Sequence, residues 1–279
     1  MFKKNRIMEM LKNKQVPLGM QVFTGHPALV EILGHSGYDF IMLDTEHSPN
    51  NARDMETLIR AADTVGLTTF VRVSRHEDES DIHRALEAGA MGIFLPLIKT
   101  ADDVRRAGDA AFFPMKGKRG ICPSLRAAQY NWRTFDDYAA WNNSEILLIP
   151  MIEQVEALEN IDEICALEDV KIIVFAGGDL AYAMGEASQM MASPKVQDAY
   201  RHVLATAKKH GVHVVGGPVL DPTVEGCRKA LDVGVTIMCL GLDTMSFRAV
   251  AESYVAVLNK SVEGTGFTRV PAPRSGLKG

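Results

Sequence analysis

Residues 147–153 read LLIPMIE and residues 172–179 read IIVFAGGD, so each stretch is a short apolar run followed by an acidic side chain. Runs of this length that end at turn residues are typical of buried parallel strands. In a closed α/β barrel the carboxyl ends of the strands open onto one shared cleft. The sequence therefore predicts that Glu153 and Asp179 meet there and bind a metal, with Mg²⁺ or Mn²⁺ favoured over zinc. Either acid alone could instead cap the helix that follows it.

Two further apolar runs end in polar groups that suit catalysis. Residues 40–47 read FIMLDTEH, and Arg72 follows the next such run. We expect His47 to be the general base, because neighbouring acids can tune its protonation. Asp44 is expected to order His47 or Arg72, although an acid here can also simply hold loop amides. Arg72 offers a planar fork for a carboxylate or an enolate oxygen, and a buried pair with Asp44 or Glu46 is compatible with that role.

Two other strand ends carry weaker signals. The pair Gly177 and Gly178 precedes Asp179 and would let the backbone approach a ligand closely. The amides of this pair are candidates for binding a substrate carboxylate, although a glycine pair alone is a weak indication. Asp243 follows the last apolar run and is expected to be a helix N-cap rather than a catalyst.

The whole chain alternates apolar, β-branched runs with helical patterns. Eight such runs match the count of a (β/α)₈ TIM barrel: 18–23, 40–43, 69–73, 92–95, 146–152, 171–175, 212–215 and 236–240. Predicted helices stop at Gly89, Gly211 and Gly234, each just before a strand. An open doubly wound sheet alternates in the same way, but FTGHP at 23–27 lacks the GxGxxG spacing of dinucleotide folds.

The prediction is one barrel domain over residues 1–263 and a flexible tail over 264–279. Between residues 97 and 146 the pattern predicts a single helix, 101–111, followed by an irregular loop rich in Pro and Gly.

Composition excludes several classes of protein. The 279 residues carry a net charge of -5, which argues against nucleic acid or an anionic membrane as the main partner. No long apolar segment follows the basic N-terminus, so we expect neither an export signal nor a transmembrane span. The cysteines form no CxxC pair and are expected to be free thiols in a reducing cytoplasm: Cys122, Cys165, Cys227 and Cys239.

Together these motifs resemble the HpcH/HpaI aldolase/citrate lyase family, the metal-dependent class II pyruvate aldolases that include 4-hydroxy-2-oxoheptanedioate aldolase. The likeness runs from about Leu18 to Met245. Its most specific parts are residues 37–50, 71–73, 118–120, 152–153, 179–185 and 241–244.

The resemblance implies roles for these residues. Glu153 and Asp179 would bind the divalent metal, Mg²⁺ or Mn²⁺ with Co²⁺ as a further candidate. His47 would be the acid/base and Arg72 would hold the keto or enolate oxygen, with Asp44 supporting both.

The resemblance also implies a reaction and an assembly. The reaction would be aldol or retro-aldol chemistry that links a 4-hydroxy-2-oxo acid to an aldehyde and pyruvate or a related 2-oxo acid. Family members use an acid from the helix after the third strand, often near a neighbour's site, and Glu87 is the nearest match. They assemble as hexamers, trimers of dimers in which the last helix packs on a partner. The apolar run at 245–258 could serve that purpose, or could satisfy its own barrel.

The chain departs from the family pattern at several places, and a loop at 119–124 that contains Pro123 is one of them. Met151 stands where Gln usually precedes the metal-binding Glu, residues 176–178 replace Gly-Pro-Ala, and Gln21 replaces an aromatic residue and is a candidate for contacting the substrate. Two alternatives stay open. One is citrate-lyase-like cleavage of a CoA thioester, although no basic pocket for CoA phosphates is obvious. The other is a barrel that binds a small acid without catalysis.

Overall fold

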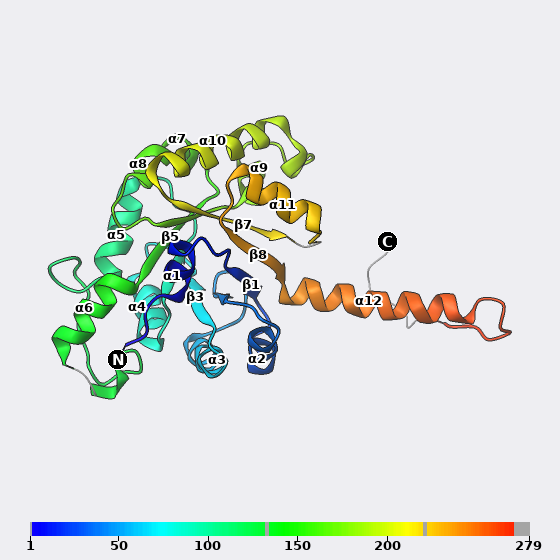
Figure 1. The fold of residues 1–279 in the computed structure, drawn as a ribbon, viewed down its shortest axis with the longest axis horizontal. Helices are drawn as coiled ribbons and strands as arrows, with labels where there is room; N and C mark the ends of the chain where they lie inside the picture. Colours follow the sequence, from blue (N-terminus) through cyan, green and yellow to red (C-terminus); the bar gives the residue numbers. More distant parts are fainter. Residues whose placement is uncertain (1, 132–133, 220–221, 271–279) are drawn as a thin grey trace.

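The computed structural model describes residues 2–131, 134–219 and 222–270. Their strands form a closed parallel barrel in chain order, with β8 paired to β1 (Figure 1). The strands are β1 (Leu18–Val22), β2 (Phe40–Asp44), β3 (Thr68–Arg72), β4 (Gly92–Leu95), β5 (Leu147–Ile152), β6 (Ile172–Phe175), β7 (His213–Val219) and β8 (Ile237–Leu242). The predicted (β/α)₈ barrel is confirmed, and the largest shift of a boundary is at β7, which continues to Val219.

The described residues also form twelve α-helices, most of which follow a strand and cover the outside of the barrel. They are α1 (Arg6–Lys12), α2 (Pro27–His35), α3 (Ala52–Thr64), α4 (Glu79–Ala88), α5 (Ala101–Ala111), α6 (Phe135–Glu145), α7 (Val155–Glu159), α8 (Ile161–Cys165), α9 (Gly177–Ala183), α10 (Pro194–His210), α11 (Val224–Val233) and α12 (Asp243–Val262). Short 3₁₀ turns lie at Gln129–Asn131 and Met190–Ala192. As predicted, α4, α10 and α11 end on left-handed glycines, Gly89, Gly211 and Gly234.

Helix α6 was not expected. The sequence pattern predicts an irregular segment there, whereas the structure has a helix from Phe135 to Glu145. Only Tyr138 and Asn142 of this helix are buried, so its sequence carries no apolar period that could reveal it.

The strands separate two apolar cores. Phe40, Phe70 and Phe94 belong to the cluster inside the barrel, where consecutive ring centroids lie 5.6 and 5.9 Å apart. Alternate residues such as Ile41 and Val71 belong to the cluster between strands and helices. Burying a large apolar side chain stabilises the fold by roughly 1.5–3 kcal/mol, so both layers hold the strand ends in fixed positions.

Helix α1 closes the amino-terminal end of the barrel. Its Ile7 and Leu11 join the inner core, so the helix acts as a plug. Asn5 caps the helix by accepting a hydrogen bond from the Met8 amide. The Asn5 side chain also donates to the Met91 carbonyl oxygen at 3.2 Å, which ties the plug to the barrel.

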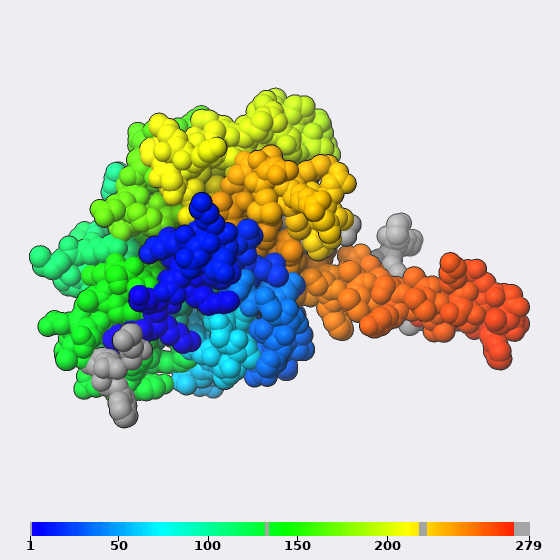
Figure 2. Space-filling model, in the orientation of Figure 1, coloured from blue at the N-terminus to red at the C-terminus, as the bar shows by residue number. Residues whose placement is uncertain are grey.

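Helix α12 leaves the barrel instead of packing along it (Figures 1 and 2). Asp243 is its only described buried residue. Large apolar side chains along it are exposed to solvent, including Phe247 at 71%, Tyr254 at 71% and Val257 at 65%. The predicted tail begins just after the end of this helix at Val262, and residues 271–279 of that tail lie outside the described residues. No described helix is long and apolar enough to cross a membrane.

The cysteines are free, as predicted, and they differ in exposure. Burial raises the pKa of Cys165 and of Cys239 to about 12, whereas Cys122 is exposed. Because the thiolate is the reactive form, we expect a thiol reagent to modify Cys122 first in the native protein. Cys165 and Cys239 should react only after unfolding, as peptide mass spectrometry would show. Fast modification of Cys239 in native protein would contradict its placement inside the barrel.

Candidate active site

Asp44 and Arg72 lie side by side at the carboxyl ends of β2 and β3, because the strand register pairs these two residues directly. Asp44 is fully buried, and one of its oxygens accepts a hydrogen bond from an Arg72 guanidinium nitrogen. Its other oxygen accepts from the His47 amide at 2.7 Å. One carboxylate thus holds both the guanidinium and the backbone of the loop that carries the imidazole.

Glu46 also belongs to this group, as one of the two partners that the sequence allowed for Arg72. Its carboxylate lies 3.2 Å from a second Arg72 nitrogen and 3.6 Å from His47 Nε2. The pKa of Glu46 is raised, chiefly by burial and in part by Asp44, while the charge of Arg72 opposes the rise.

Arg72 keeps part of its hydrogen-bonding capacity free. Its Nε is buried and has no hydrogen-bond partner among the described residues. The guanidinium carbon lies 5.9 Å from the centre of the Phe23 ring, which follows β1. The ring of Phe23 therefore places an aromatic face near Arg72 at this end of the barrel. Gln21, which stands where the family pattern has an aromatic residue, does not provide one. Met20 and Val22 belong to the outer core, so strand alternation directs Gln21 toward the barrel interior.

Glu153 follows β5 and is 3% exposed. Its Oε1 accepts a hydrogen bond of 2.5 Å from the amide of Leu97, which follows β4. Leu97 adopts a φ of 56°, a left-handed conformation that is uncommon for a leucine and that tends to occur at functional sites. The Leu97 amide therefore fixes one oxygen of the Glu153 carboxylate and leaves the second oxygen for another partner.

Asp179 lies in the first turn of α9, after β6, and is exposed. The pKa of Glu153 is raised to about 7, chiefly by burial, and the charges of Asp179 and Glu46 contribute to the rise. The negative charges of these carboxylates repel each other, and a divalent cation bound between them would offset that repulsion.

The available ligands fit an ion such as Mg²⁺, which needs few protein ligands, and do not form a site made of protein ligands alone. Among the described residues, no group of three or more His, Cys, Asp or Glu side chains is arranged to hold a metal. Mg²⁺ commonly uses one or two carboxylates and takes its other oxygen ligands from water and substrate. Glu153 and Asp179 are the two carboxylates that would hold it here.

The profile of the HpcH/HpaI aldolase/citrate lyase family matches residues 18–249. The chain belongs to this family. It is therefore an enzyme of the carbon–carbon lyase class. One relative, the 5-keto-4-deoxy-D-glucarate aldolase of Salmonella paratyphi C, is 31% identical over 256 residues, which make up 92% of this chain and 97% of the relative.

Two solved structures agree with the barrel described above. The citrate synthase SbnG is 28% identical with a TM-score of 0.81, covering 91% of this chain and 98% of its own. An HpcH/HpaI aldolase/citrate lyase family protein from Burkholderia cenocepacia J2315 is 26% identical with a TM-score of 0.84, covering 92% of this chain and all of its own.

The structure shows the surroundings of two residues that depart from the HpcH/HpaI pattern. Met151 is buried in the inner core, two residues before Glu153. Gly177 is buried, and a Cβ atom at this position would collide with the Met191 sulfur. The Met191 side chain thus lies close to the space that a Pro would occupy in the usual family motif.

One acid is not placed as the sequence suggested. Asp243 is not an N-cap; α12 begins at Asp243 itself, and Leu242 is the capping position. Its carboxylate accepts from the amides of Phe23 and Thr24 at 3.0 and 2.9 Å, which joins the ends of β8 and β1. Glu87 lies on α4, the helix after β3 that the sequence indicated, 4.0 Å from Arg119.

Proposed function

We propose that the protein is a divalent-metal-dependent aldolase that cleaves a 4-hydroxy-2-oxo acid to an aldehyde and pyruvate or a related 2-oxo acid. The observation that carries this proposal is the buried Glu153 carboxylate, held by the Leu97 amide and electrostatically coupled to Asp179 and Arg72. The name of the Salmonella relative, an aldolase acting on a keto-deoxy sugar acid, supports the same substrate class.

A divalent ion held by Glu153 and Asp179, Mg²⁺ or Mn²⁺ with Co²⁺ as a further candidate, would supply Lewis-acid polarisation of the substrate's carboxylate and keto oxygens. Gly177 and Gly178 would let the backbone approach the carboxylate, and Gln21 would contact the substrate from β1. No lysine is required for a Schiff base in this scheme.

The remaining chemistry belongs to the Arg72, Asp44 and His47 group. His47 removes the proton from the C4 hydroxyl, the C3–C4 bond breaks, and C4 becomes the aldehyde carbon. The electron pair of that bond moves onto the 2-oxo acid fragment as an enolate, whose oxygen Arg72 stabilises. Asp44 keeps the guanidinium and the His47 backbone in place through its two hydrogen bonds. Protonation of the enolate carbon completes the release of the 2-oxo acid.

The direct test is release of pyruvate from a panel of 4-hydroxy-2-oxo acids after chelation and add-back of Mg²⁺, Mn²⁺ or Co²⁺. Metal-dependent release from at least one compound is expected, and the panel would identify the preferred aldehyde. If no metal supports release of pyruvate and the protein still binds a 2-oxo acid, the result would favour a barrel that binds small acids without turnover.

His47→Ala is expected to lower turnover by roughly 10²-fold to 10⁴-fold, the usual contribution of a positioned acid or base. Metal affinity, measured by calorimetry, should change little because His47 is 61% exposed and is not one of the proposed ligands. His202→Ala, an exposed histidine on α10, is the matched control and should keep full activity. An unchanged pH–rate profile in His47→Ala would assign the proton transfer to another group.

Arg72→Lys is also expected to be inactive. The guanidinium contacts Asp44 and Glu46 with two different nitrogens, and a single ammonium group cannot reproduce that fork. A turnover near that of the wild-type enzyme in Arg72→Lys would show that only the positive charge is needed.

The extended α12 supports a homo-oligomeric enzyme, and we propose a hexamer built as a trimer of dimers. Apolar side chains are also exposed on the two helices that flank α12 in Figure 1, namely Ile32 of α2 and Val224 and Val233 of α11. In this assembly the partner's α12 packs on those helices, and Glu87 would act near a neighbour's site.

A further inference from the structure

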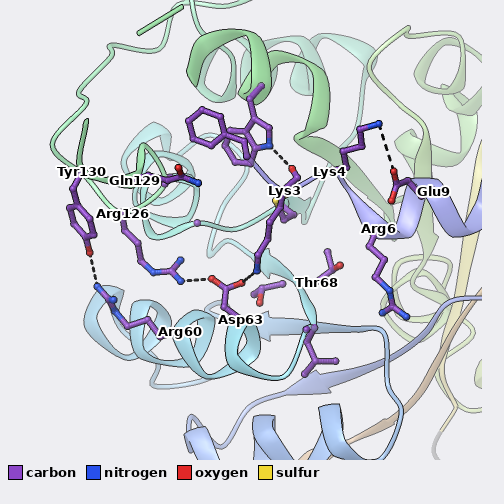
Figure 3. Close-up of a pocket in the computed structure, with 18 residues that line it drawn as sticks. Lys3, Lys4, Arg6, Glu9, Arg60, Asp63, Thr68, Arg126, Gln129 and Tyr130 are labelled. Atoms are coloured by element: carbon purple, nitrogen blue, oxygen red, sulfur yellow. Dashed lines mark hydrogen bonds and ion pairs between the residues drawn. The ribbon is translucent and has the colours of Figure 1, made fainter. Parts of the chain in front are cut away.

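A cavity lies at the amino-terminal end of the barrel, away from the candidate active site. It has a volume of about 810 Å³ and is lined by the N-terminal segment, the start of β3, the end of α4 and residues 126–130 (Figure 3). Thr68 begins β3 at this cavity, whereas Arg72 ends the same strand at the active site. A ligand here would therefore not overlap the substrate.

The lining of the cavity is rich in positive charge. It contains two acidic side chains, Glu9 and Asp63, and five basic ones, Lys3, Lys4, Arg6, Arg60 and Arg126. Three of the basic groups pair along the rim: Lys4 with Glu9 at 4.0 Å, Arg6 with Asp39 at 2.7 Å, and Arg60 with Glu56.

Lys3 and Arg126 are different, because they share one carboxylate. Both form ion pairs with Asp63, so two positive charges converge on a single negative charge (Figure 3). Arg126 also donates to the Ala88 carbonyl oxygen at 2.8 Å, at the end of α4. A Cβ atom at residue 89 would collide with the guanidinium, so Gly89 is required for this position of Arg126. The Lys3 and Arg126 pair thus retains an excess of positive charge, and the contacts with Ala88 and Gly89 hold Arg126 in place.

A buried hydroxyl group in the same lining has its hydrogen-bonding capacity free. Thr69 is 3% exposed, and its Oγ1 has no hydrogen-bond partner among the described residues. Leaving a buried hydroxyl unpaired is costly, so such a group is expected where a ligand completes the set. Backbone strain accompanies it at the rim, where Gln129, Tyr130 and Asn131 all have φ values between 52° and 68°.

The cavity also has an aromatic wall. Phe2 and Trp141 stack with ring centroids 5.1 Å apart, and both line the cavity. The volume falls in the range of sites for small organic ligands, and is far larger than an inorganic ion needs. The occupant should therefore combine an acidic group with a flat apolar body.

We propose that this cavity binds a small organic anion, a carboxylate or a phosphate attached to a flat ring. The acidic group contacts Lys3 and Arg126, and the ring lies against Phe2 and Trp141. Thr69 Oγ1 is buried beneath the lining and donates a hydrogen bond to the acidic group once the lining shifts slightly. Binding stabilises the folded state, because the N-terminal segment and the loop at 126–130 are joined through the ligand.

The test uses the full-length protein in the presence of a chelator, with phenyl phosphate, benzoate and inorganic phosphate as probes. Saturable binding of one or both ring compounds is expected by calorimetry, with a rise in melting temperature. Inorganic phosphate alone should bind at least several-fold more weakly, because it lacks the ring. Comparing phenyl phosphate with benzoate identifies the preferred acidic group.

Three variants assign binding to this cavity. Lys3→Gln and Arg126→Gln should each weaken binding, whereas Asp63→Asn should tighten it by roughly threefold to tenfold by removing the competing carboxylate. Because the variants of the basic residues should weaken binding and the variant of the acidic residue should tighten it, a ligand contact can be told from general destabilisation. If Arg126→Gln fails to fold, Lys3→Gln and Asp63→Asn are enough for this comparison. Lys209→Gln, a surface lysine that pairs with Asp162, is the control and should bind normally.

Binding should persist in Glu153→Gln, since that residue lies at the other end of the barrel. The proposal is overturned if none of the three probes binds, if Lys3→Gln and Asp63→Asn leave the affinity unchanged, or if Glu153→Gln abolishes binding.

Discussion

Replacing Glu153 by Gln, or Asp179 by Asn, is expected to abolish metal-dependent carbon–carbon cleavage while leaving the barrel folded. Each substitution keeps the shape of the side chain and removes the charge that would hold the ion. Lewis-acid polarisation contributes several kcal/mol to such a reaction, so activity should fall by roughly 10³-fold or more. Circular dichroism would report the fold, and calorimetry with Mn²⁺ would report the loss of metal binding independently of activity.

Glu156→Gln is the matched control for this experiment. Glu156 lies three residues beyond Glu153 on α7 and pairs with Lys99 at 3.0 Å on the protein surface. Its substitution should alter neither metal affinity nor turnover. Full activity of Glu153→Gln or Asp179→Asn after chelation and metal add-back would remove that residue from the proposed metal site.

Removing the chain from Met245 onward is expected to give a monomeric or aggregated protein without activity. Most of α12 is lost, and with it the exposed apolar side chains that we propose to pack on a partner. Burial of each large apolar side chain contributes roughly 1.5–3 kcal/mol, so several of them together can hold a stable interface. Sedimentation velocity and an activity assay on the same sample would measure both effects. Removal of residues 271–279 alone should be mild.

A single charged side chain on the apolar face of α12 should also disrupt the oligomer. Tyr254→Glu would put a carboxylate in the proposed interface and should dissociate the oligomer. Ala256→Glu adds the same charge two residues further along, on the opposite face of the helix, and should be tolerated. A fully active wild-type monomer in sedimentation would rule out the assembly and return every catalytic role to one subunit.

Much of the candidate active site was predictable because it lies at strand ends. An apolar run followed by an acid both defines a strand and places the acid at the mouth of the barrel, as for Glu153 and Asp44. The sequence left the partner of Arg72 open between Asp44 and Glu46. The structure shows that Arg72 contacts both, because the loop after β2 turns back toward it. The amide of Leu97 could not be foreseen, because a left-handed leucine has no sequence signature.

The sequence by itself determined the order of the eight strands, most of the helices between them and the strand ends that carry acids. These features follow from local periodicity, which reports which residues must be buried. Closure of the barrel and helix α6 were visible only in the structure. Tertiary structure alone decided where α12 points, how Asp243 joins β8 to β1, and how Lys3 and Arg126 meet at Asp63. Periodicity shows that an apolar face must be covered, but it does not show which surface covers it. Contacts between residues far apart in the chain form only when the barrel closes.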